Sequence, residues 1–149
     1  MPSAVSADPI FVATRLRPVL LKLNRELRRE IHSLGVTGGQ VSLLIQIQKL
    51  PGMGVRELAT RERMSVPGMS KYVARLESAG LVRREELEED KRRVGLRLTD
   101  EGTRVLQSVK RRRTAWLAER LRDLEPDELG AVDAAVEPLL KLLNEEAAA

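Results

Sequence analysis

Apolar residues recur every three or four positions along most of this chain, and this spacing changes to alternation only after Gly80. The first pattern lines one face of an amphipathic helix, whereas alternation places every second residue on one face of a strand. A strand is expected over 81–85, and Val94, Leu96 and Leu98 alternate as its return strand. The sequence therefore predicts a mainly α fold with one small β-hairpin.

The centre of the chain has the layout of a helix-turn-helix. Thr37 is the expected N-cap of a helix that reaches about residue 50, and a shorter helix follows over 55–62. A tight turn then leads to a second N-cap, Ser65, and to a helix that ends near Gly80. Two short helices joined by a tight turn are typical of this DNA-binding motif. In the second of them, the residues predicted to face the core are Met69, Val73 and Leu76.

Longer helices are predicted on both sides of this centre. The segment 10–34 has an apolar face and an opposite basic face. A second helix is expected to begin at the N-cap Thr99 and to run to about residue 124. Pro126 opens a last helix, whose apolar stripe runs to residue 143 and predicts a packing role.

The expected hairpin has a charged tip over 86–92, and three neighbouring cations, Lys91, Arg92 and Arg93, stand at its end. A hairpin that directly follows the second helix of a helix-turn-helix is a wing. Cations at the end of a wing are placed to reach the adjacent minor groove of DNA.

Composition excludes several classes of function. Cysteine is absent, which rules out disulfides, thiolate nucleophiles and thiol redox switches. His32 is the only histidine, so catalytic triads and metal sites have little support, and neither a metal nor a cofactor is expected. Aromatic residues make up 2%, which argues against recognition of single strands by base stacking. No apolar run or leader pattern points to a membrane or to export, so a cytoplasmic protein is expected.

Charge is distributed unevenly along the 149 residues, a length that suits one domain. Residues 123–149 carry eight acidic side chains against Lys141 alone, a net charge of −7. The whole chain has a net charge of +4, which leaves +11 for residues 1–122. A basic body of this kind is typical of a phosphate-binding surface. The alternative interpretation is that the charged runs are solvated helix faces.

Several motifs in this order resemble the MarR family of bacterial transcriptional regulators. The resemblance covers residues 10 to 145. The motifs are Thr37-Gly38-Gly39-Gln40, Val55-Arg56-Glu57-Leu58-Ala59, Leu76-Glu77-Ser78-Ala79-Gly80-Leu81-Val82, Asp90-Lys91-Arg92 and Leu96-Arg97-Leu98-Thr99-Asp100-Glu101-Gly102.

The resemblance implies a homodimeric winged-helix protein that binds a pseudo-palindromic DNA operator and usually represses its own or a neighbouring operon. Residues 1–149 are then one domain, with a winged helix-turn-helix DNA-binding region over 37–100 and a helical dimerisation region formed by 10–34 and 103–145. The apolar residues expected in the dimer interface are Leu16, Leu20, Leu23, Leu129, Val136, Leu139 and Leu143.

The resemblance also implies that the helix from Ser65 reads the major groove and that Arg92 enters the minor groove, where negative potential is concentrated. Family helices often carry Thr or Arg where this chain has Ser70 and Lys71, so no base preference is carried over. For Lys71, a guanine contact and a phosphate contact both stay open. For Arg56, the alternatives are a phosphate contact and no contact with DNA. The expected DNA-binding residues are Thr37, Arg56, Ser65, Pro67, Gly68, Ser70, Lys71, Arg75, Lys91, Arg92 and Arg93.

Members of the family are commonly released from DNA by small aromatic or anionic compounds. The residues that could form such a ligand site here are Phe11, Arg15, His32, Arg112 and Trp116. The alternative interpretation is that Phe11 and Trp116 belong to the core and that His32 caps a helix end.

Two other classes of function were weighed against a DNA-binding regulator. An enzyme is not supported, because no positioned acid–base pair is identifiable. A winged-helix module that binds another protein, or a protein that binds DNA without sequence preference, remains the alternative. Salt separates these interpretations, since contacts to phosphates weaken steeply as salt rises and apolar protein contacts do not.

Overall fold

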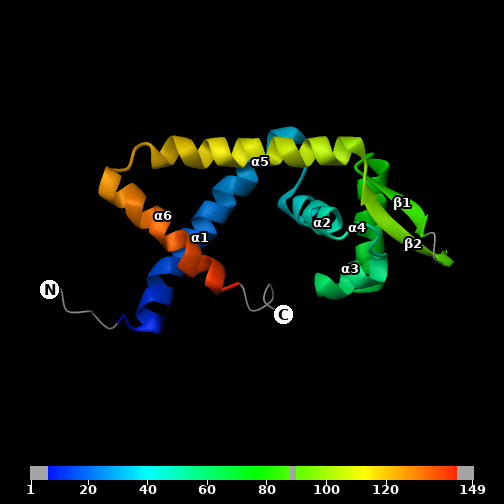
Figure 1. Ribbon diagram of the computed structural model, residues 1–149, viewed down its shortest axis with the longest axis horizontal. Helices are drawn as coiled ribbons and strands as arrows, with labels where there is room; N and C mark the ends of the chain where they lie inside the picture. The colour runs from blue at the N-terminus through cyan, green and yellow to red at the C-terminus, as the bar shows by residue number, and fades with distance from the viewer. Residues whose placement is uncertain (1–6, 88–89, 144–149) are drawn as a thin grey trace. The chain divides into compact units, whose positions relative to one another are not determined.

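The computed structural model confirms a mainly helical chain with a single hairpin (Figure 1). It describes residues 7–87 and 90–143, and the side chains of residues 90–92 lie outside this description. The chain divides into two compact units, residues 1–113 and 114–149, and the boundary lies within the helix that spans residues 100–121. The two units are described separately. The elements are α1 (Pro9–Glu30), a 3-10 turn (His32–Leu34), α2 (Gly38–Lys49), α3 (Val55–Arg61), α4 (Val66–Ser78), β1 (Val82–Leu87), β2 (Asp90–Leu98), α5 (Asp100–Leu121) and α6 (Pro126–Lys141).

The predicted N-caps are confirmed. Thr37 and Gln40 form a reciprocal capping box at α2: the Gln40 N–H donates to Thr37 Oγ1 at 3.1 Å, and the Thr37 N–H donates to Gln40 Oε1 at 3.0 Å. At α4 the Gly68 N–H donates to Ser65 Oγ at 3.1 Å. Each cap satisfies amide groups that have no partner inside the helix, and so fixes where the helix begins.

The turn between α3 and α4 is held by backbone bonds. Arg63 has a positive φ of 55°, the only such non-glycine residue in the part of the chain described. This conformation lets the Met64 N–H reach the Ala59 carbonyl at 2.9 Å, which closes the end of α3. The tight turn predicted between the two helices is therefore present at this position.

The end of α4 leads directly into the hairpin. Gly80 has φ 76°, a left-handed conformation that glycine adopts without strain. The Gly80 N–H donates to the Glu77 carbonyl and the Leu81 N–H to the Leu76 carbonyl, at 2.9 and 3.0 Å. This pair of bonds is a Schellman motif, so the direction in which the hairpin leaves α4 is set by local backbone geometry.

The hairpin differs from the predicted one at its tip and on its apolar face. β1 extends to Leu87 and β2 begins at Asp90, so most of the predicted tip over 86–92 belongs to the strands. Charged, exposed residues continue the ladder here because backbone pairing does not require an apolar face. Leu96 is fully buried and bridges Met53, whereas Val94 is 43% exposed, so the apolar face is confined to the base of the hairpin.

The core of the first unit lies among α2, α3, α4, the base of the hairpin and the first half of α5. Val41, Leu44 and Ile47 of α2 are buried, whereas Ile45 is only half-buried. The predicted inward residues of α4 are also buried. Leu106 of α5 is also nearly fully buried. This core places α4 with one face inward and the other open to solvent.

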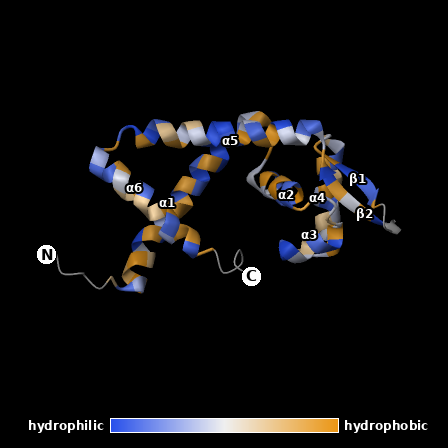
Figure 2. Ribbon diagram, viewed as in Figure 1, coloured by the Kyte–Doolittle hydropathy of each residue, from blue (hydrophilic) through white to orange (hydrophobic). Residues whose placement is uncertain are grey.

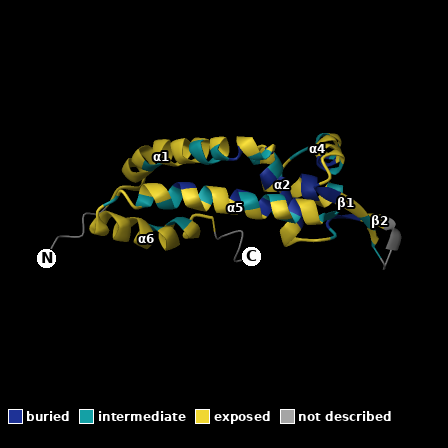
Figure 3. Cartoon of the chain, turned by 90° about the horizontal axis from the view of Figure 1, so that it is seen from above, coloured by how far each residue is buried: buried dark blue, intermediate teal, exposed yellow. Residues whose placement is uncertain are grey.

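α1 ends earlier than predicted and leaves its apolar face uncovered. The α-helix stops at Glu30, and the remainder of the predicted segment 10–34 contains the buried Ile31 and the 3-10 turn. No residue of α1 is buried, and Leu20 is 44% exposed. Figures 2 and 3 show hydrophobic residues along α1 and, in the other unit, α6 that are coloured as exposed.

Gly102 marks the closest packing in the first unit. A Cβ at this position would overlap the carbonyl oxygen of Leu81, which is backbone and cannot move aside by a rotamer change. We therefore expect Gly102→Ala to lower the free energy of unfolding by about 1–3 kcal/mol, as overpacking does elsewhere. Urea unfolding followed by circular dichroism measures the effect.

Gly39→Ala is the matched control, because a Cβ there would meet nothing closer than Thr37 Oγ1 at 3.9 Å. Since Ala is the better helix former, this variant should be as stable as the parent or more stable. Equal stability of the two variants would contradict the packing described for Gly102.

Candidate nucleic-acid interface

α4 has an exposed face opposite its core face. The side chains on the exposed face include Lys71 and Arg75, while Ser70 is half-buried. Tyr72 is 40% exposed, and the Arg75 guanidinium carbon lies 6.0 Å from the centroid of its ring. The sequence-predicted residues of this helix therefore share one rigid element, which the buried Met69, Val73 and Leu76 anchor to the core.

An open groove of about 550 Å³ runs beside this face of α4. Arg56 of α3, Arg84 of β1 and Arg93 of β2 line it, together with Ser70 of α4. The groove thus collects cations from three elements that are separate in sequence. Sequence analysis named Arg56 and Arg93 but missed Arg84, although its place two residues after the buried Val82 puts it on the same face of the hairpin.

A second positive region lies at the start of α2. Arg28 lies against the N-terminal end of α2, because a Cβ added to Gly38 would stand 2.9 Å from Arg28 Nε. Burial and the nearby charge of Arg28 lower the pKa of Arg113. Thr37, one of the predicted DNA-binding residues, caps this same helix end, where the dipole is positive. Arg28 was missed because only the fold brings α1 to this end of α2.

The hairpin carries a second group of charges, in which one carboxylate lies between two arginines. Arg83 and Arg97 are cross-strand partners, an arrangement in which like charges repel. Glu85 lies 3.2 Å from Arg83 and 2.5 Å from Arg97, and so offsets part of this repulsion. Within residues 7–87 and 93–143, no carboxylate forms an ion pair with Arg56 or Arg93. Arg56 and Arg93 are therefore the groove arginines without a described carboxylate partner, whereas Arg84 pairs with Glu77 at 2.7 Å.

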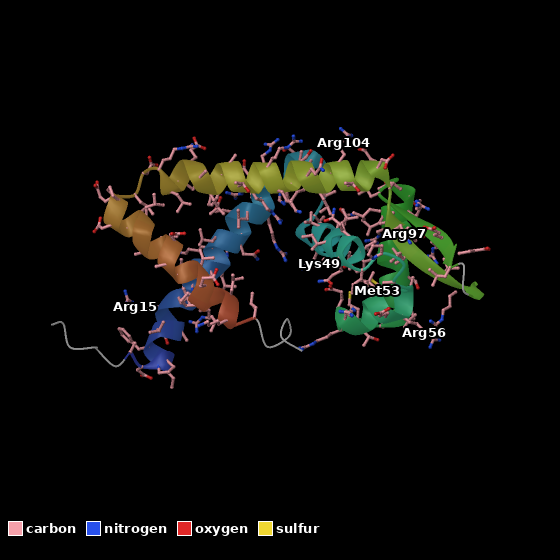
Figure 4. The ribbon with its side chains drawn as sticks, viewed as in Figure 1. Arg15, Lys49, Met53, Arg56, Arg97 and Arg104 are labelled. Carbon is pink, nitrogen blue, oxygen red and sulfur yellow. The ribbon has the colours of Figure 1, made fainter. Side chains whose placement is uncertain are left out.

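The remaining wing residues are only partly described. Lys91 and Arg92 belong to β2, but their side chains lie outside the described residues, so their predicted roles stay predictions. Arg93 is exposed and lines the groove. Figure 4 shows Arg56 and Arg97 on the side of the unit that holds α3 and the hairpin, with Arg104 on α5 at the opposite side.

The five candidate ligand residues fall in both units, with Trp116 in the second, so their grouping into one site stays a prediction. Arg15 stacks on Phe11, with its guanidinium carbon 5.4 Å from the ring centroid, on the exposed first half of α1. His32 and Arg112 are exposed. Trp116 is buried in the second unit, and the Arg120 guanidinium covers its ring at 3.8 Å. The alternative interpretation placed Phe11 and Trp116 in the core. Trp116 is buried as that interpretation requires, whereas Phe11 is exposed.

Two further kinds of feature are absent from the described residues. These residues contain no group of three or more His, Asp or Glu side chains that could hold a metal ion. None of their helices combines the length and hydropathy that crossing a membrane requires.

Comparison with known proteins agrees with this arrangement. The model of the MarR family matches residues 36–94, which contain α2 to the start of the return strand. An HTH-type transcriptional regulator of Mycobacterium bovis is 31% identical over 134 residues, which are 90% of this chain and 94% of its own. The HTH-type transcriptional repressor MdtR of Bacillus subtilis is 29% identical over 83% of this chain and 81% of its own.

Solved structures match the same arrangement. A MarR family protein from Bacillus stearothermophilus superposes with a TM-score of 0.78 at 22% identity, over 93% of this chain and 99% of its own. A variant of MepR from S. aureus, bound to an oligodeoxyribonucleotide, gives a TM-score of 0.68 at 18% identity, over 89% and 97%. These likenesses establish the fold. Together with the sequence identity to the mycobacterial regulator, they show that this chain belongs to the MarR family of transcriptional regulators.

Proposed function

We propose that this protein is a homodimeric transcriptional repressor, not an enzyme, that binds a pseudo-palindromic operator in double-stranded DNA. The observation that carries the proposal is the groove beside α4, where Arg56 and Arg93 have no carboxylate partner among the described residues. Cations beside a helix suit a duplex, because a phosphate backbone borders the groove that the helix enters. The oligodeoxyribonucleotide-bound MepR variant and the repressor MdtR support this assignment.

The proposed contacts divide by chemistry. Ser70, Lys71 and Arg75 face the base edges, with Ser65, Pro67 and Gly68 forming the first turn that enters the major groove. Thr37 and Arg56 hold phosphates, because one caps a helix end and the other lines the groove. Lys91, Arg92 and Arg93 contact the minor groove. Phosphate contacts fix the register of the protein, and contacts to bases carry the sequence preference.

Dimerisation is proposed from the exposed apolar residues of the two terminal helices. Leu20 and Leu23 of α1 and Val136 of α6 are 44%, 38% and 48% exposed, whereas Leu16 and Leu139 are half-buried. An extensive apolar surface on one chain is typical of a protein–protein interface. A second copy is the proposed occupant, since a two-fold dimer presents two α4 helices to two half-sites.

Selection from a random pool of duplex DNA tests the proposal. We expect a pseudo-palindrome whose half-sites lie about 34–36 Å apart, one helical turn. Binding with no sequence preference would replace the regulator with a non-specific DNA-binding protein, and no binding would favour a protein-interaction module. Release by an aromatic or anionic compound remains a prediction from the family resemblance.

Arg56→Ala should weaken binding to selected and unrelated duplexes by the same factor, because a phosphate contact carries no sequence information. It should also reduce the slope of log affinity against log salt by about 1. Fluorescence anisotropy over a range of salt concentrations measures both. Arg104→Ala is the control, since Arg104 pairs with Glu101 on the opposite side of the unit. An equal change of slope in both variants would contradict the role of Arg56.

Leu20→Asp should abolish the dimer, because burying a charge without a partner costs several kcal/mol. We expect the dimer dissociation constant to rise by at least about 100-fold, which corresponds to about 2.7 kcal/mol. Light scattering at several protein concentrations gives the result. Leu50→Asp is the control, as Leu50 is similarly exposed at 38% but ends α2. An intact Leu20→Asp dimer would remove α1 from the interface.

A further inference from the structure

We propose that Glu77 and Arg84 are a positioning pair that fixes the wing against α4, and that recognition of a DNA sequence depends on this pair. The inference rests on the proposed function and assigns roles to two residues outside the predicted site. Arg84 Nε donates a hydrogen bond to Glu77 Oε1 at 2.7 Å. Glu77 lies in the last turn of α4 and Arg84 near the start of β1, which runs beside α4 (Figure 1).

Arg84 occupies an unusual position for a charged residue. Its cross-strand partner is Leu96, which is fully buried, and its neighbour on the same face of β1 is the buried Val82. Cross-strand partners lie on the same face of a hairpin, so the Arg84 side chain leaves β1 on the face that packs on the core. The Arg84 side chain is nevertheless 43% exposed, so its guanidinium lies at the rim of that face rather than in the core. There it pairs with Glu77, which ties it to α4.

The pair is the ion pair that joins α4 to the hairpin among the described residues. The other ion pairs of the hairpin join Glu85 to Arg83 and to Arg97. Those two stiffen the hairpin internally, but they do not fix its angle to α4. Beyond the Gly80 turn, that angle therefore depends on packing at the base of the hairpin and on the bond between Glu77 and Arg84.

The angle matters because the groove beside α4 is built from both parts. Ser70 comes from α4, whereas Arg84 and Arg93 come from the hairpin. A rotation of the hairpin would move the cations relative to the base-reading side chains. Contacts to the bases require that α4 and the wing keep a fixed arrangement. Electrostatic attraction to the phosphates of any DNA does not require it. Loss of the pair should therefore affect specific binding more than non-specific binding.

The sign of the effect distinguishes positioning from simple charge. Removing an acidic residue from a DNA-binding protein strengthens binding by charge alone. We instead expect Glu77→Gln to weaken binding to the selected duplex about two- to fivefold, the factor that an exposed ion pair contributes. Binding to an unrelated duplex should stay equal or become tighter. Glu77→Gln binding the selected duplex as tightly as the parent would overturn the proposal.

Glu57→Gln is the matched control. Glu57 lines the same groove, but its partner is Arg61 of the same helix, at 3.6 Å. This variant loses the same charge without loosening the wing, so its binding to both duplexes should be unchanged or tighter. Weaker specific binding of equal size in Glu57→Gln would show that charge at the groove, rather than the pair, sets the affinity.

A charge exchange completes the test. Glu77→Arg combined with Arg84→Glu restores an ion pair with opposite polarity, and we expect it to recover specific affinity relative to either single charge reversal. Continued loss in the folded double variant would indicate that Arg84 contacts DNA itself and would overturn the positioning role. Thermal unfolding of every variant separates loss of fold from loss of position. If the parent protein selects no site, the proposed function fails first, and this inference with it.

Discussion

Thr99 joins three elements on which the geometry of the interface depends. Its hydroxyl donates to the Gly80 carbonyl at 2.6 Å and accepts from the Gly102 N–H at 3.0 Å, while its own N–H donates to the Leu81 carbonyl at 3.1 Å. The end of α4, the base of the hairpin and the start of α5 therefore meet at one residue. Because backbone groups make most of these contacts, the junction is rigid and leaves no room for a side chain at Gly102.

Farther from this junction, the hairpin depends more on ion pairs than on apolar packing. The buried apolar face of the hairpin ends between Leu96 and Val94. Beyond it Val94 is 43% exposed and Leu87 is half-buried, so the outer half of the strands packs less tightly than the base. The arginines there have distinct electrostatic surroundings. Glu85 pairs with both Arg83 and Arg97, whereas no carboxylate among the described residues pairs with Arg93. The hairpin can therefore be basic where it borders the groove, with part of the repulsion along its ladder offset by Glu85.

Features set by local interactions were predictable from the sequence. The caps Thr37, Ser65 and Thr99 and the inward residues of α4 follow from side-chain chemistry and helical spacing, and all are confirmed. The length of the hairpin was not, because charged residues such as Glu86 pair through their backbone and give no apolar signal. Arg28 and Arg84 were missed because their importance comes from partners that only tertiary structure brings near. Local rules thus predict the scaffold, and tertiary contacts decide which cations serve the groove.

The proposed dimer explains how so few base-reading side chains can suffice. In the proposed complex α4 offers Ser70, Lys71 and Arg75 to the bases, and each good contact contributes about 1–3 kcal/mol of discrimination. One half-site then distinguishes its sequence only modestly from the competing DNA of a genome. Two half-sites joined rigidly add their free energies, but only if each α4 and its wing keep a fixed geometry. Specificity therefore depends on stiffness at the Thr99 junction and along the hairpin as much as on the residues that touch DNA.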